Sequence, residues 1–146
     1  MNIRLAVADD LGELAILFDQ YRVFYRQASD LDGSLQFLTD RLSDDSMIFI
    51  AADKRNVLAG FTQLYPRLSS TRMQSLWLLN DLFVSPVFRG NGISKMLINR
   101  AKTLCRDTNA CELILETEKN NSIANRLYID TGFKKDCDHN YYSWSY

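Results

Sequence analysis

Apolar positions in the first third of the chain recur at the spacing of two helices. A short alternating stretch, 2–7, precedes Asp10-Leu-Gly-Glu13, which has the form of a capping box at the start of a helix. The inner face of this helix is expected to carry Leu14, Leu17, Phe18 and Tyr21. Asp32 is expected to cap a second helix, whose apolar stripe is formed by Leu35, Leu38 and Leu42. Both helices precede the main sheet.

Three apolar segments in the middle of the chain predict neighbouring strands. Residues 46–52 and 57–65 flank a polar turn, which is typical of a β-hairpin, and Pro66 is expected to close the second strand. Residues 67–74 are polar and rich in serine and threonine, so they predict a surface loop. Residues 75–84 are too apolar for an edge strand, and we expect them to form the central strand.

The carboxy-terminal half predicts a strand, glycine loop, helix and strand, followed by a closing segment. The apolar positions of the first helix are Ile93, Met96, Leu97, Ala101 and Leu104. The next strand is expected over 111–116, and a further helix over 123–130 ends near Gly132, a candidate left-handed cap. Residues 141–146 alternate like a last strand.

This order of elements predicts one α/β (α+β) domain over residues 1–146. An antiparallel first half joined to one helical crossover gives a mixed, mostly antiparallel sheet of six or seven strands with about four helices. The chain of 146 residues is 47% hydrophobic, which is enough for one real core.

Charge and cysteine content exclude several functions. The 17 basic and 18 acidic side chains form no long single-sign run, so no nucleic-acid or membrane partner is expected. No apolar segment approaches about 20 residues, and no signal sequence is apparent, which predicts a cytoplasmic protein. The three cysteines and His139 lack metal-ligand spacing, so no metal site is expected and the thiols should be reduced.

The strongest chemical signal is Arg89-Gly-Asn-Gly-Ile-Ser94, between an apolar strand and a helix. Glycines let the backbone approach a ligand, and the free N–H groups of a helix start attract phosphate. A dinucleotide fingerprint would need a third glycine where Lys95 stands, and the phosphate-loop spacing is absent. A tight turn with a solvated Arg89 is the structural alternative.

Two motifs together resemble the GNAT family of N-acetyltransferases. Residues 81–97 are similar to its acetyl-CoA motif, Arg/Gln-x-x-Gly-x-Gly/Ala, with Ser94 in place of the last small residue. Residues 121–133 are similar to the family pattern Asn-x-x-Ala-x-x-x-Tyr-x-x-x-Gly-Phe. The resemblance implies an acetyltransferase that takes acetyl-CoA as co-substrate, and a central strand pair that splays apart.

The resemblance also implies residue roles. Tyr128 would protonate the departing thiolate, with core packing as its alternative, and Asn121 would bind pantetheine amides or cap its helix. The implied cofactor-binding residues are Phe83, Val84, Arg89, Gly90, Asn91, Gly92, Ile93, Ser94, Asn121 and Tyr128.

Asp81 is the best placed acid to receive the amine proton, with a structural hydrogen-bonding role as the alternative. Strand alternation turns Asn80 to the opposite face unless a bulge intervenes. His139 lies in a polar loop and is expected to be solvated.

The resemblance assigns the acceptor side to the first helices and to Asp81, so Tyr21, Phe24 and Tyr25 are candidate substrate-binding residues, with core packing as their alternative. The expected acceptor is the primary amine of a small molecule, such as a polyamine or amino acid, or a lysine or peptide amine. A non-catalytic acyl-CoA-binding module is the alternative function. A homodimer through 141–146 is expected, as is common in the family.

Overall fold

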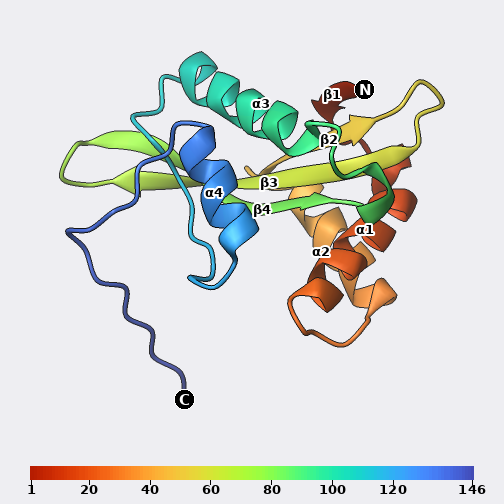
Figure 1. Cartoon of the computed structure of the whole chain (residues 1–146), viewed down its shortest axis with the longest axis horizontal. Helices are drawn as coiled ribbons and strands as arrows, with labels where there is room; N and C mark the ends of the chain where they lie inside the picture. The colour runs from red at the N-terminus through yellow and green to blue at the C-terminus, as the bar shows by residue number, and fades with distance from the viewer. The chain divides into compact units, whose positions relative to one another are not determined.

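The computed structural model describes residues 1–146, which divide into two compact units, Met1–Glu116 and Thr117–Tyr146. The first holds β1 (Asn2–Leu5), η1 (Ala8–Asp10), α1 (Leu11–Phe24), α2 (Leu31–Leu42), β2 (Met47–Ala52), β3 (Leu58–Ser69), β4 (Gln74–Val84), η2 (Pro86–Phe88), α3 (Ile93–Asp107) and β5 (Leu113–Ile114) (Figure 1). The second holds α4 (Ser122–Asp130). The mixed α/β class and the four α-helices are confirmed.

The sheet has five strands in the order β1-β2-β3-β4-β5, antiparallel except for the parallel pair β4–β5. The prediction of six or seven strands is therefore wrong. Residues 141–146 form no strand and their aromatic side chains are exposed, because an alternating pattern makes a strand only where a neighbour takes up its backbone hydrogen bonds. The middle strand is β3, rather than the predicted 75–84.

Helices cover both faces of the sheet in the first unit, with α1 and α2 on one face and α3 on the other (Figure 1). Ile48 and Ile50 of β2 belong to the core under α1 and α2. Phe49 alternates to the opposite face, where the Arg100 guanidinium of α3 lies 4.4 Å from the centre of its ring. Ile93, Leu97, Ile98, Ala101 and Leu104 of α3 are all buried, as the periodicity predicted for four of them.

The predicted capping box at Asp10 and Glu13 does not form. The Asp10 carboxylate accepts from both Arg4 guanidinium nitrogens, at 2.7 and 2.8 Å, and from the Val7 N–H. Glu13 accepts the Leu58 N–H at 2.8 Å instead of reaching back along its own helix. A bidentate pair with arginine is stronger than a neutral cap contact, so the long-range partner prevails.

The residue that caps α2 is Asp30, two residues before the predicted cap, Asp32. Asp30 accepts the Gly33 N–H at 2.9 Å, and Asp32 lies in the first turn. Leu38 is buried, but Leu35 is 41% exposed. Asp30 is also fixed from outside the helix, because its N–H donates to the Asp19 carboxylate at 2.7 Å.

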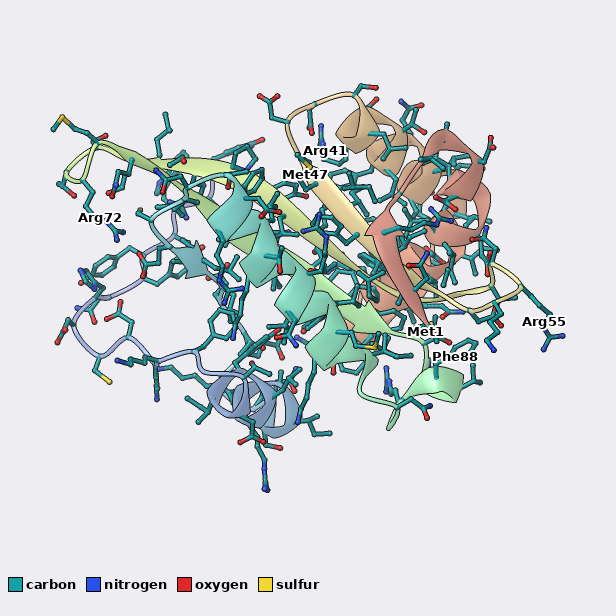
Figure 2. The ribbon with its side chains drawn as sticks, turned by 90° about the horizontal axis from the view of Figure 1, so that it is seen from above. Met1, Arg41, Met47, Arg55, Arg72 and Phe88 are labelled. Carbon is teal, nitrogen blue, oxygen red and sulfur yellow. The ribbon has the colours of Figure 1, made fainter.

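Pro66 does not close β3, which continues to Ser69 and pairs there with β4. β2 begins at Met47, opposite Leu64, so the other side of β3 has no strand partner from Tyr65 onward. Proline is tolerated on such an edge because no ladder partner needs its missing N–H. The hairpin thus reaches further than predicted, and Arg72 projects at its tip, where it pairs with Glu112 at 2.6 Å (Figure 2).

Candidate functional site

The parallel pair β4–β5 is brief. Trp77 pairs with Leu113 and Leu78 with Ile114, and no further residues of the two strands are paired. From Leu79 to Val84 one edge of β4 therefore has no strand beside it, while the other edge stays paired with β3. Pairing of the two strands therefore stops beyond Leu78, as the expected splaying of this strand pair requires.

A β-bulge interrupts β4 where its polar residues occur. Gln63 of β3 pairs with Asp81, but the next residue, Leu64, pairs with Leu79, so Asn80 is the extra residue. The Asn80 side-chain amide then donates to Asp81 Oδ2 at 3.1 Å. The bulge thus places the side chains of Asn80 and Asp81 close enough to bond, whereas consecutive side chains of a regular strand point to opposite faces.

Asp81 is buried, and its hydrogen bonds come from neutral groups. Its Oδ2 accepts from Gln63 Nε2 at 2.9 Å as well as from Asn80, and the Tyr21 hydroxyl donates to the same carboxylate. Thr62 holds the main chain, with its hydroxyl donating to the Asp81 carbonyl at 2.8 Å. Burial raises the pKa of the Asp81 carboxyl, and these donors only partly oppose it.

Tyr21 joins helix α1 to the bulged strand. Its ring contacts Phe61 and Phe83 edge-on, with centroids 5.8 and 6.1 Å away, and packs against Tyr25 at 5.1 Å. Phe24 in turn packs on Tyr25 and is 53% exposed. The predicted acceptor-side residues thus lie in one aromatic array next to Asp81, and only Tyr21 among them reaches the carboxylate.

Arg89 is turned toward the aromatic array. Its Nε donates to the Val84 carbonyl at 3.0 Å, and its guanidinium lies 5.9 Å from the Phe24 ring centre and 5.7 Å from that of Phe83. Arg89 is exposed, as its alternative role in a tight turn expects, and it also makes these contacts. The side chain links the end of α1 to the end of β4 within this unit.

The glycine loop has the backbone conformation that its residues suggest. Gly90 and Gly92 have φ angles of 80° and 73°, which disfavour any residue with a Cβ. The Asn91 amide donates to the Phe88 carbonyl, and Figure 2 shows Phe88 on the turn ahead of α3. The first turn of α3 has no acidic residue and no side-chain cap, so its N–H groups remain for an anion. Ile93 is buried, so only its main chain is open to a ligand.

In the second unit, α4 carries the other two predicted residues. Asn121 caps the helix, accepting the Ala124 N–H at 3.1 Å, so its structural alternative holds. The Tyr128 ring meets Phe133 edge-on at 5.7 Å, and Gly132 takes a φ of 90° in the predicted cap. Asp81 and the glycine loop belong to the first unit, and Tyr128 to the second.

Gln63 and Tyr65 were missed by the sequence analysis. Gln63 is fully buried, and its Nε2 also donates to the Tyr65 hydroxyl, while its Oε1 has no hydrogen-bond partner. Burial and the nearby Asp81 raise the pKa of Tyr65 to about 12. A long amide in the otherwise apolar strand was the available signal, and it becomes meaningful only with its partner across the strands.

Two predicted exclusions concern metals and membranes. No group of three or more His, Cys, Asp or Glu side chains is arranged to hold a metal ion, and none of the helices is long and apolar enough to cross a membrane. His139 is exposed, as expected, with Nδ1 2.8 Å from the Asp136 carboxylate.

Comparison with known proteins gives the same family for the sequence and the fold. The description "Acetyltransferase (GNAT) family" matches residues 14–133. An uncharacterized N-acetyltransferase of Bacillus subtilis strain 168, YhfO, is 43% identical over 136 residues, which cover 93% of this chain and 91% of that protein.

Solved structures share the fold. The crystal structure of a probable acetyltransferase is 34% identical, with a TM-score of 0.94, and the match covers 100% of this chain and 98% of that one. The structure of AAC(6')-Iy in complex with the bisubstrate analog CoA-S-monomethyl-acetylneamine has a TM-score of 0.83 at 23% identity, covering 99% of this chain and 97% of that chain.

Proposed function

Because the chain belongs to the acetyltransferase (GNAT) family, we propose that this acetyltransferase transfers acetyl from acetyl-CoA directly to a primary amine. The acceptor is a small molecule such as a polyamine or amino acid, or a lysine or peptide amine. One observation carries the choice of an amine: a buried carboxylate, Asp81, lies on the bulge of β4 with only neutral donors around it. Such a carboxylate binds a proton more readily than one paired with a cation, because a neighbouring cation lowers the pKa of a carboxyl.

The residues of the glycine loop fit the pyrophosphate of acetyl-CoA. The left-handed Gly90 and Gly92 have open space where a Cβ would stand, and the uncapped start of α3 favours negative charge. We assign the pyrophosphate to the main-chain N–H groups of Arg89, Gly90, Asn91, Gly92, Ile93 and Ser94. The unpaired edge of β4 at Phe83 and Val84 would hold the pantetheine arm, and Asn121 would add a side-chain contact beside its cap role.

Asp81 is assigned as the proton acceptor for the amine. An alkylammonium group has a pKa near 10.4 and must lose a proton before it can attack, because only the neutral amine has a free electron pair. The raised pKa of Asp81 brings this carboxyl closer to neutral pH, where a base is most useful. Tyr21 holds the carboxylate in place, and Phe24 and Tyr25 extend the acceptor side.

Acetyl-CoA supplies the acetyl group as a thioester. Tyr128 is assigned as the donor of a proton to the departing thiolate, on the strength of its place in the motif of residues 121–133. A phenol with a reference pKa near 10 is a workable donor to a thiolate near 8.5. A homodimer and a cytoplasmic location are further parts of the proposal that rest on the resemblance alone.

A thiol-release assay tests the proposal. Acetyl-CoA is incubated with polyamines, L- and D-amino acids, aminoglycosides and a lysine-containing peptide, and CoA binding is measured by calorimetry. One amine class should stimulate release, which would identify the acceptor. The Tyr128→Phe variant should bind CoA normally and lose about 10²-fold or more in kcat. Binding of CoA with no amine acetylated across the panel would contradict the amine assignment.

A further inference from the structure

Gln63 is in a position that an apolar residue would fill at lower cost. It lies on β3 beside the cross-strand pair of Phe61 and Phe83, and it is fully buried. Its Oε1 has no hydrogen-bond partner, and a buried acceptor without a partner destabilises a fold. Packing alone therefore does not explain a glutamine here, and the contacts of its Nε2 atom must account for it.

The donor end of Gln63 is fully used. One amide proton is directed to Asp81 Oδ2 at 2.9 Å and the other to the Tyr65 hydroxyl oxygen. If the Gln63 side-chain amide were flipped by 180°, Oε1 would face Asp81 Oδ2. These two oxygens are both acceptors and would repel each other. The orientation that leaves Oε1 unpaired is thus the one that supports a charged Asp81.

We propose that Gln63 is a positioning residue that holds Asp81 ready to accept the amine proton, by donating to its charged form across the β3–β4 bulge. This inference rests on the role proposed for Asp81 above. Gln63 acts through Asp81, because its side chain is fully buried and its amide donates directly to the carboxylate.

Asn80 and Tyr21 also donate to the Asp81 carboxylate and favour its charged form, so Gln63 is one of three neutral donors. Tyr21 of α1 donates to the carboxylate but carries no positive charge, and Tyr65 of β3 stays protonated. Arg41, in the last turn of α2, and Asp44, which follows that helix, act on Tyr65 and pair with each other at 2.6 Å. No cation therefore replaces the Gln63 amide as a partner of the ionised carboxylate.

The test uses Gln63→Met, which keeps length and removes the donor, and Gln63→Glu, which keeps shape and adds a like charge. Thr62→Val is the matched control, since Thr62 is equally buried and bonds the Asp81 main chain instead of its carboxylate. Two readouts are measured on the full chain. The first is the carboxyl titration of Asp81 by carbon NMR, and the second is kcat/KM against pH with the acceptor amine that the thiol-release assay identifies.

The Asp81 titration is expected to move to higher pH by about one unit in Gln63→Met and further in Gln63→Glu, and to stay in place in Thr62→Val. The acid limb of kcat/KM should move with it, so that activity below the limb falls about tenfold for each unit. A merely structural role for Gln63 would lower stability without moving either midpoint.

The two proposals fail in different ways. An unchanged Asp81 titration in whichever Gln63 variant folds overturns the inference about Gln63. A titration that moves while the activity limb does not leaves Gln63 as the partner of Asp81 but removes Asp81 as the base. A shift in Thr62→Val equal to that in Gln63→Met also overturns the inference, because the effect would then come from the loosened strand.

Discussion

Two aspartates of this chain are equally buried and have opposite chemistry. Asp10 is 5% exposed and Asp81 is 6% exposed. The Arg4 guanidinium, bonded to both oxygens of Asp10, lowers the pKa of that carboxyl, whereas burial among neutral donors raises the pKa of Asp81. A small exposed fraction alone therefore does not fix the direction of a carboxyl's pKa shift, which depends on the charge of its partner and on the depth of its burial.

The difference separates a structural pair from a group suited to proton transfer. Arg4 also donates to Asn56, so the Asp10 pair ties β1 and the start of α1 to the turn after β2. Around Asp81 the structure provides hydrogen bonds without a compensating cation, at a bulge beside an unpaired strand edge. A carboxylate of the first kind stabilises the fold, and one of the second kind costs stability and is available for chemistry.

The largest effect should come from Asp81→Asn. The variant keeps the size of the side chain and removes the proton acceptor, so kcat/KM for the amine should fall about 10²–10³-fold at neutral pH. The melting temperature and the affinity for CoA should be retained, as measured by circular dichroism and calorimetry. Activity within a few fold of the wild type would show that Asp81 is only a structural partner.

Asp10→Asn should have the opposite profile, with activity kept and stability lost. The change removes a nearly buried carboxylate from a partly exposed arginine, and the free energy of unfolding should fall by about 2 kcal/mol. Urea unfolding measures the loss, and Arg4→Met is the matched partner variant. If Asp10→Asn impaired turnover more than stability, the contrast between the two aspartates would not hold.

The smallest and most diagnostic effect is the pH dependence of stability. The unfolded pKa of both groups is near 3.9, so Asp10, with its lowered folded pKa, contributes stability that is lost as pH falls below that value. Asp81 has a raised folded pKa, so the wild type loses stability as pH rises from about 3.9 through that pKa.

The variants should therefore differ in the sign of their slopes. Asp81→Asn, relative to the wild type, should gain stability between pH 4 and pH 7, and Asp10→Asn should come closest to the wild type in acid. The free energy of unfolding of each protein, measured from pH 4 to pH 7, gives these slopes. Parallel curves for the wild type and Asp81→Asn would mean that the Asp81 pKa is not raised by folding.

Local patterns predicted the helices well and the strand ends poorly. The stripe of α3 and the left-handed turn at Gly132 follow from residues close in sequence, and both are confirmed. Pro66 within β3 and the coil at 141–146 depended on whether a neighbouring strand was present, which no local pattern records. For the same reason the cap at Asp32 was wrong, because Asp19 fixes Asp30 from another helix.

The candidate site likewise has some features that local sequence predicts and others that depend on residues distant in the chain. Residue types at fixed spacing were enough to predict the family and the glycine loop, and they made Asp81 the candidate acid. The three-dimensional structure was needed to find the bulge at Asn80, the donation of Gln63 and Tyr21 to the Asp81 carboxylate, and the contact of Arg89 with Phe24 and Phe83. A carboxyl's pKa depends on desolvation and on partners up to 60 residues away in sequence, as Tyr21 is from Asp81, and those are set by strand register and helix packing.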